Sequence, residues 1–288
     1  MGGLRGVLPG GYWDPEGTLH REFELVELTG REEELLAESG RRESASLVSV
    51  VLSRCVGRIG PVSPVPEDVA RRLLVADRQF LLLQLRRATF GDRVHADLFC
   101  PWPDCGERVS LAFSIEAIPV EAPAGRAPTY TVTLSEAAGA AEVEFRLPTG
   151  ADQEELSPWL AHDEAQALTR LLARCVLRVG PSGSGVDALS PLARAEIEAR
   201  MAEVAPRIEQ TVEARCAGCG RSFSAPLDIH RFFFGELRAD PDLLYREVHY
   251  LAYHYHWSEA EIMAMTRDRR RRYMDVLAGE IERLNDAG

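Results

Sequence analysis

One stretch of this chain occurs twice, and this repetition restricts the fold more than any other feature of the sequence. The segment LSRCVGRIGP, from Leu52 to Pro61, aligns with LARCVLRVGP, from Leu172 to Pro181, at an offset of 120 residues. Upstream of these segments, Thr29 and Thr149 lie at the same offset, and each is followed by glycine. Self-similarity at a fixed offset is the signature of a repeated structural unit. We therefore expect one unit of about a domain's size to occur twice in series.

The order of elements predicted for each unit is typical of an α+β fold. A strand leads into the Thr-Gly turn, helices follow, and two short strands then flank a cysteine pair. Acidic residues such as Glu32 and Asp152 favour a helix directly after each turn, because they interact well with the N-terminal end of the helix dipole. Apolar residues spaced by about 3.6 positions predict one helix from Asp68 to Phe90, with a counterpart from Pro191 to Val204.

These patterns divide the chain into five segments. We predict an N-terminal arm at residues 1–20, a first α+β repeat at 21–120, a linker and hairpin strand at 121–142, a second repeat at 143–237 and a C-terminal aromatic helical hairpin at 238–288. The linker is rich in Pro, Ala and Gly, which is typical of a boundary between units. We expect a pseudo-twofold axis between the repeats, with Cys55 and Cys175 buried at equivalent places.

Four of the six cysteines form two close pairs at equivalent places of the repeats. The first pair lies in CPWPDCG and the second in CAGCG, so a glycine follows the second cysteine each time. A tight turn aims both sulfurs of a pair at one point, and a structural Zn²⁺ ion takes four such ligands with no open position for catalysis. The sequence therefore predicts one structural Zn²⁺ ion, held by Cys100, Cys105, Cys216 and Cys219. The alternatives are relic pairs or redox-active pairs, although the thioredoxin-like context of a redox pair is absent.

The C-terminal segment contains five of the seven Tyr residues and one of the four Trp residues. Pro241 after an aspartate predicts one helix start, and Ser258 with Glu261 predicts a second through a capping box. Aromatic side chains are enriched at protein interfaces, and two short helices cannot bury this many rings between themselves. We predict that the hairpin packs weakly on the body and binds another protein, through Tyr245, Tyr250, Tyr253, His256, Trp257 and Arg270. The alternative is that the body covers these rings.

Composition and missing motifs exclude several classes of function. The net charge of −12 argues against general binding to nucleic acids or anionic membranes. All 33 basic residues are arginines, which excludes a Schiff-base lysine and a phosphate-loop lysine. No apolar run is long enough to span a membrane, and no enzyme motif is present. We therefore expect a non-enzymatic protein of the cytoplasm, where cysteines are reduced or metal-bound.

Two resemblances rest on these motifs. The repeated unit, with its Thr-Gly turns, Arg-Cys helices, Phe90-Gly-Asp92 and the knuckle from Cys100 to Cys105, is similar to the T4-type baseplate hub assembly chaperone family. The segment from Leu244 to Arg272 resembles small aromatic-His-Trp proteins of contractile phage tails and extracellular injection systems, and the short tail-assembly chaperones of contractile phages. One unit is expected in the phage proteins, whereas this chain has two units and a fused tail.

The resemblances imply an assembly chaperone or baseplate subunit of a phage-tail-like contractile injection system. Its partners would be other baseplate, tail or tape-measure proteins, met either in the cytoplasm or in the assembled particle. The alternative is a zinc-ribbon regulator that binds nucleic acid, which requires a basic face around the knuckles. The charges there are mixed and disfavour nucleic acid: Asp97, Asp104, Glu107, Arg108, Arg215 and Arg221.

Overall fold

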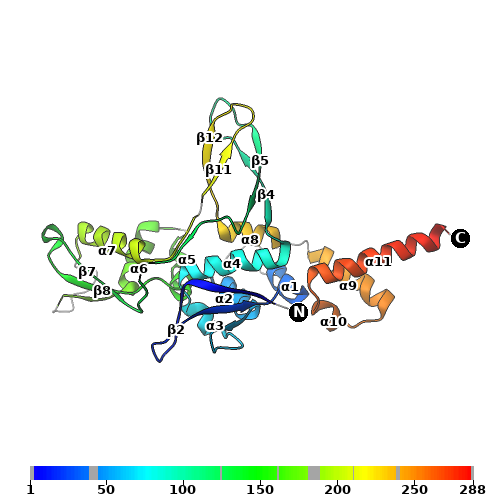
Figure 1. The fold of residues 1–288 in the computed structure, drawn as a ribbon, viewed down its shortest axis with the longest axis horizontal. Coiled ribbons are helices and arrows are strands. Elements are labelled where there is room, and N and C mark those ends of the chain that lie inside the picture. The colour runs from blue at the N-terminus through cyan, green and yellow to red at the C-terminus, as the bar shows by residue number, and fades with distance from the viewer. Residues whose placement is uncertain are drawn as a thin grey trace.

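The computed structural model describes residues 3–38, 45–123, 125–160, 162–180, 189–209, 211–237 and 241–286. Helices alternate with several small antiparallel sheets, so the predicted α+β class is confirmed (Figure 1). The described part has a two-unit body, a stalk that rises from it and a group of helices that extends from one end (Figure 1). In each of these parts, local sequence signals set the bounds of helices and strands. Contacts between segments far apart in the chain then hold these elements together.

The first unit is built on the three-stranded sheet β1-β2-β3, with β1 at Leu4–Trp13, β2 at Leu19–Leu25 and β3 at Val56–Ile59. Helices α1 (Gly30–Glu38) and α2 (Ala45–Cys55) connect β2 to β3. Residues 1–20 were expected as an arm, but β1 pairs with β2 and buries Leu8 and Tyr12 in the core. The strand joins the sheet because these apolar side chains have a core to enter.

The second unit repeats this arrangement in the sheet β7-β8-β9, with β7 at Tyr130–Thr133, β8 at Glu142–Phe145 and β9 at Val176–Val179. The short 3₁₀ helix η1 (Glu136–Ala138) joins β7 to β8, and α5 (Gly150–Leu160) and α6 (Glu164–Cys175) connect β8 to β9. Cys55 and Cys175 end the equivalent helices and are both buried, as predicted.

The two sheets agree in strand register as well as in order. The pairing of β2 with β3 and that of β8 with β9 each have one irregularity at the same point, and every pair between β8 and β9 lies 120 residues after its counterpart between β2 and β3. In the first sheet the pairs are Phe23↔Ile59, Glu24↔Arg58 and Leu25↔Val56. In the second sheet they are Val143↔Val179, Glu144↔Arg178 and Phe145↔Val176.

The helix predicted from Asp68 to Phe90 is two helices, α3 (Glu67–Arg72) and α4 (Val75–Phe90). Leu73 and Leu74 between them are extended and pair with the Thr-Gly turn of the second unit: Leu74 bridges Thr149, and the Gly150 N–H donates to the Leu73 carbonyl at 3.0 Å. The prediction was wrong because helical periodicity continues through a break whose cause lies in another part of the chain.

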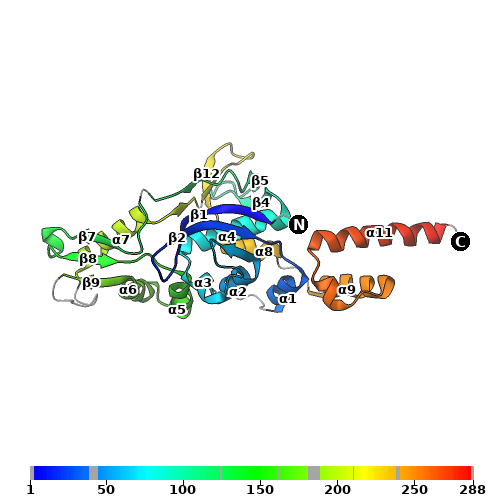
Figure 2. The ribbon, with the colours of Figure 1, turned by 60° about the horizontal axis from the view of Figure 1, so that its bottom comes forward.

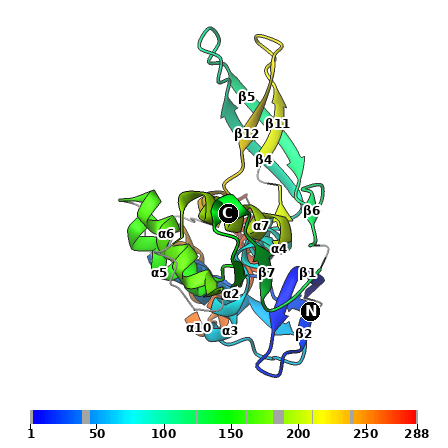
Figure 3. The same cartoon turned by 90° about the vertical axis from the view of Figure 1, so that its left-hand side faces the viewer.

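The stalk consists of two hairpins, β4 (Arg93–Phe99) with β5 (Arg108–Ser114) and β11 (Thr211–Arg215) with β12 (Ser222–Pro226), which rise from the body side by side (Figures 1 and 3). At its base, β6 (Val120–Glu121) pairs with β10 (Arg207–Ile208), which follows α7 (Pro191–Val204). Helix α8 (Ile229–Leu237) leaves the stalk and returns to the first unit, where Phe233 and Phe234 enter its core.

The helical parts of the units meet head to tail. Helices α2, α3 and α4 of the first unit contact α5 of the second, whereas α1, the counterpart of α5, contacts α8 and two C-terminal helices. The expected pseudo-twofold axis would bring equivalent faces together, and this prediction is therefore wrong for the helical parts.

The C-terminal segment forms three helices rather than a two-helix hairpin: α9 (Pro241–Tyr255), α10 (Glu259–Met263) and α11 (Arg267–Asp286). The predicted capping box of Ser258 and Glu261 is present at the start of α10. The three helices have a small core of their own, which includes Leu244, Leu251 and Ile262. They extend from the α1 end of the body, on the side away from the second unit (Figure 2).

Candidate metal centre and C-terminal interface

The four cysteines predicted to bind metal come together at the tip of the stalk. Their sulfur atoms all lie within 4.8 Å of one another. Cys100 Sγ lies 3.7 Å from Cys219 Sγ, and Cys105 Sγ lies 3.6 Å from Cys216 Sγ. Four thiolates around a tetrahedral Zn²⁺, with Zn–S near 2.3 Å, are about 3.8 Å apart. The spacing therefore fits a tetrahedral thiolate site.

Each knuckle is a tight turn that the strand ends hold in place. The Cys100 N–H donates to the Glu107 carbonyl at 2.8 Å, and the Cys216 N–H donates to the Arg221 carbonyl at 3.0 Å. The glycine after each second cysteine has a positive φ, 64° at Gly106 and 73° at Gly220. Side chains rarely adopt this conformation, which explains why both turns carry glycine there despite their different lengths.

Backbone amides and neighbouring sulfurs set the acidity of the thiols. The N–H groups of Cys219 and Gly218 point at Cys216 Sγ and lower the pKa of this thiol to about 7. At Cys105, the Glu107 amide also favours the thiolate, but burial and the other three sulfurs outweigh it and raise the pKa to about 12. Four thiols this close cannot all ionise by themselves, because like charges repel. Full ionisation requires a cation among them.

The two knuckles also contact each other outside the sulfur cluster. Arg221 donates both Nη atoms to the two carboxylate oxygens of Asp104, at 2.9 and 2.7 Å, and its guanidinium lies over the Trp102 ring. A Cβ on Gly218 would lie 2.9 Å from Glu107 Cγ, so the second knuckle has no room for a side chain there. The arrangement holds the two hairpins in one relative position.

Of the basic side chains named beside the knuckles, Arg108 and Arg221 are paired with acids, and Arg215 donates to the Gly220 carbonyl at 3.0 Å. Arg108 contacts Asp97 at 2.5 Å, and Arg221 contacts Asp104. Paired guanidinium groups have less charge to offer to phosphates, which disfavours the nucleic-acid alternative. The exposed apolar groups at this tip are Phe99 and Trp102.

We call the three C-terminal helices, at residues 241–286, the tail. The aromatic residues of the tail that were predicted to bind a partner differ in their surroundings. Tyr250 and Tyr253 are 47% and 69% exposed. Tyr253 stacks on His249 and Tyr250 stacks on His254, and the two stacked pairs form a row on α9 that we call the aromatic ridge. Trp257 instead packs against Tyr255 and Tyr273 inside the tail. These contacts leave the ridge, rather than the tryptophan, as the aromatic surface open to a partner.

Tyr245 and His256 occupy the two ends of α9. The Tyr245 hydroxyl donates to Glu34 Oε1 on α1 at 2.7 Å, and this bond raises its pKa. His256 follows the helix with a φ of 58° and is exposed. Tyr245 therefore contacts the body, and His256 stands apart from the stacked row.

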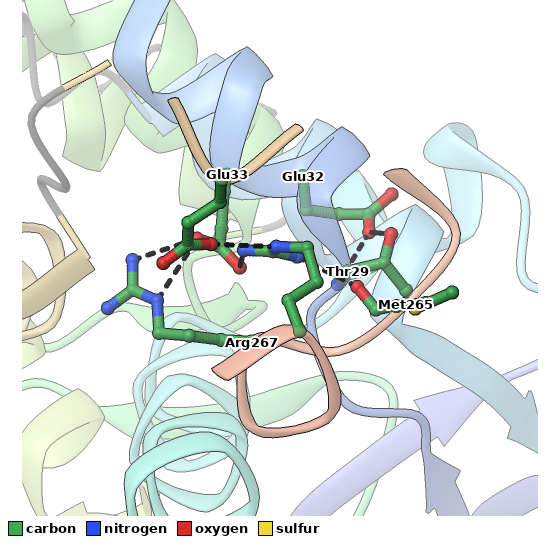
Figure 4. Close-up of polar contacts among 7 residues, drawn as sticks. Thr29, Glu32, Glu33, Met265 and Arg267 are labelled. Atoms are coloured by element: carbon green, nitrogen blue, oxygen red, sulfur yellow. Dashed lines mark hydrogen bonds and ion pairs between the residues drawn. The ribbon is translucent and has the colours of Figure 1, made fainter. Parts of the chain in front are cut away.

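Arg270 was predicted to face a partner, but its side chain is fully buried. It donates to Glu33 Oε1 on α1 at 2.9 Å, to Glu247 Oε2 on α9 at 3.0 Å and to the Met265 carbonyl at 2.9 Å. Arg267 contacts the other oxygen of Glu33 at 2.9 Å (Figure 4). The prediction failed because an arginine within a run of arginines has no sequence signal for burial.

Glu33 is a buried residue of the contact between α1 and the C-terminal helices that sequence reasoning missed. Its side chain is 2% exposed and accepts bonds from both Arg267 and Arg270. In the sequence it is one acid among several at the start of a helix, where the dipole explains such residues. Its carboxylate is buried because the tail covers it, and a tail more than 230 positions away gives no local signal.

A family described as T4 bacteriophage base plate protein matches residues 19–234. The chain belongs to this family. A separate family of unknown function, DUF6760, matches residues 237–288, which are the C-terminal helices. A search of curated proteins and a search of solved structures each found no match.

Membership gives this baseplate-family protein a structural or assembly role at a phage baseplate, with other tail or baseplate proteins as interaction partners. The first family match ends within α8 and the second begins at the last residue of α8, so the boundary between the matches lies just before the tail begins at α9. Each helix of the baseplate-family protein that the structure describes is too short or too polar to cross a lipid bilayer.

Proposed function

We propose that this baseplate-family protein is a non-enzymatic assembly factor, either a chaperone or a retained baseplate subunit, of a phage-tail-like contractile injection machine. The observation that carries this proposal is the family match over residues 19–234. The proposed partners are other baseplate, tail or tape-measure proteins of the machine. The protein meets them in the cytoplasm or within the assembled particle, and it acts by binding alone.

The proposed cofactor is one structural Zn²⁺ ion bound by Cys100, Cys105, Cys216 and Cys219. The sulfur spacing and the amides that point at the thiolates support it. The ion would neutralise the four thiols and fix the two hairpins to each other, and four protein ligands leave no position for a substrate.

The proposed domain division is two related units, at residues 21–120 and 143–237, followed by the C-terminal helices at 238–288. The common strand register at an offset of 120 residues supports a duplication. The first unit would also include β1, since its counterpart β7 occupies the same edge of the second sheet.

Elemental analysis tests the zinc proposal. The purified protein should contain about one Zn²⁺ per chain, and Cys219→Ser should release it and increase proteolysis of the stalk. Cys175→Ser is the control for the loss of a thiol, because this cysteine is buried in the core of the second unit, away from the knuckles. A folded protein without metal, or equal metal content in both variants, would contradict the proposal.

Variants of the aromatic ridge test the assembly role of the tail. Tyr250→Ala with Tyr253→Ala should abolish incorporation into the particle, or capture by its components, when the variant is co-expressed with the other genes of the machine. The change should shift stability by less than about 0.5 kcal/mol, because both rings are exposed. Leu177→Ala, an exposed apolar residue on β9, is the control. Normal incorporation of the double variant would show that the ridge is not the docking surface.

A further inference from the structure

The interface between the tail and α1 uses a specific set of backbone and side-chain contacts. The Gly30 N–H donates to the Met265 carbonyl at 3.2 Å, and Thr29 forms a β-bridge with Thr266. Directly after this bridge, α11 begins and brings Arg270 to Glu33. We call this set of contacts the tail joint.

The contact between the two units has the same backbone geometry. The Gly150 N–H donates to the Leu73 carbonyl at 3.0 Å, and Leu74 forms a β-bridge with Thr149. Helix α4 begins directly after this bridge and places the fully buried Arg78 against Gly150. We call this set the unit joint.

The helices that enter the two joints correspond residue by residue at an offset of 192. Pro66 and Ser258 are the N-caps of α3 and α10. Helix α4 begins at Val75 and α11 at Arg267, and the buried arginines are Arg78 and Arg270. The preceding helices also correspond, since α2 contacts α5 and α9 contacts α1. The helices α9, α10 and α11 therefore contact α1 in the way that α2, α3 and α4 contact α5.

The two joints differ in how much of the helix that follows the bridge is buried in the core of the body. Seven residues of α4 are buried, and its leucines belong to the main core of the first unit. Of α11, only Arg270 and Leu277 are buried, and the tail packs its apolar residues in a cluster separate from the body. The contacts across the tail joint are mainly polar: Glu33 with the two arginines, Glu34 with Tyr245, and the backbone of the Thr-Gly turn.

We propose that the α1 face, formed by Thr29, Gly30, Glu33 and Glu34, is a recognition site for the C-terminal helices as a separable ligand. The occupant is the three-helix segment at residues 241–286. It contacts α1 in the same arrangement in which α2, α3 and α4 contact α5. This segment packs its apolar residues in a core of its own, and a polar joint with paired charges favours specificity over permanent attachment. The proposal assigns a binding partner to the DUF6760 region: the first unit of a baseplate-family protein.

Severing the chain at the boundary tests this inference on the whole protein. A specific protease site is inserted between Leu237 and Pro241, the folded protein is cut, and association of the two parts is followed by gel filtration and by titration after dilution. The parts should stay together after cleavage and re-associate after separation. Arg270→Met should weaken their association by about 30-fold or more, because it leaves the buried Glu33 carboxylate short of a partner.

Matched variants separate recognition from misfolding. Arg271→Met changes an exposed arginine beside Arg270 and should leave association unchanged. Gly30→Ala acts from the body side, because its Cβ would lie 3.0 Å from Met263 Sδ and 3.1 Å from Arg270 Nη1, and it too should weaken association without loss of helicity. Gly57→Ala, whose nearest neighbours would be 3.7 Å away, is its control. Parts that separate on cutting and do not re-associate at about 100 μM, or equal effects of Arg270→Met and Arg271→Met, would overturn the proposal.

Discussion

The tail joint and the unit joint have the same backbone geometry but different side-chain chemistry. At the unit joint, Arg78 donates within its own unit, to Ser49 Oγ at 2.8 Å and to the carbonyls of Ala45 and Ala70. At the tail joint, Arg270 reaches across to a carboxylate of the body. The arginine of the unit joint is therefore part of a permanent core, whereas that of the tail joint connects two separately packed bodies.

This difference shows that the same backbone contact at a Thr-Gly turn can belong either to a fixed core or to a separable interface. A Thr-Gly turn followed by a helix offers a free N–H and an open face to any segment that is extended for two residues and then helical. Whether the contact is permanent depends on the surrounding apolar packing, because burial of apolar area is the dominant stabilising term. Polar pairing selects which segment binds.

Replacing the two buried arginines gives the largest expected difference between the joints. Arg78→Met should lower the free energy of unfolding of the body by about 3 kcal/mol or more, because it leaves buried carbonyls without donors. Arg270→Met should change the body transition by less than about 1 kcal/mol and should loosen only the tail. Denaturant unfolding, followed separately for body and tail by hydrogen exchange, measures both. Equal losses in the body transition would mean that the tail joint is as deeply integrated as the unit joint.

The acids behind the two Thr-Gly turns should differ in their dependence on pH. Burial opposes the ionisation of Asp152, but bonds from Arg146, the Thr149 amide and Arg174 outweigh it and hold its pKa well below the usual range. The stabilisation from this ion is therefore present above the unfolded pKa, about 3.9, and is lost as the pH falls toward the folded value.

Asp152→Asn should accordingly cost about 3 kcal/mol at pH 7, since it breaks a buried ion pair, and the difference from the unchanged protein should shrink below about pH 4. Glu32→Gln, at the equivalent position of α1, is the control, because its nearest arginine is 4.0 Å away and the loss should be smaller. Urea unfolding between pH 7 and pH 2.5 measures the difference. A loss that does not depend on pH would mean that the charge of Asp152 is not what stabilises the turn.

Local patterns in the sequence were enough to predict much of the stalk and its cysteines. Helix α7 has the predicted bounds, because prolines limit it at both ends, and β11 and β12 flank the second cysteine pair as predicted. The convergence of the two cysteine pairs also followed from the repeat.

The features that sequence reasoning missed depend on contacts between distant segments. The breaks before α4 and α11 arise where the chain pairs with Thr149 and Thr29, and no local residue signals them. The burial of Arg270 and Glu33 likewise exists only when the tail meets α1. A repeat predicts the fold of each copy, but it does not predict which faces of the copies meet.

Native-state hydrogen exchange of two glycine amides tests the difference between the joints most directly. The Gly30 amide is bonded to Met265 and the Gly150 amide to Leu73, so each reports the opening of one joint. If the tail is a separable ligand, the Gly30 amide should exchange by local opening, about 100-fold or more faster than the Gly150 amide, which should open only with the body. Equal protection of the two amides, or faster exchange at Gly150, would contradict it.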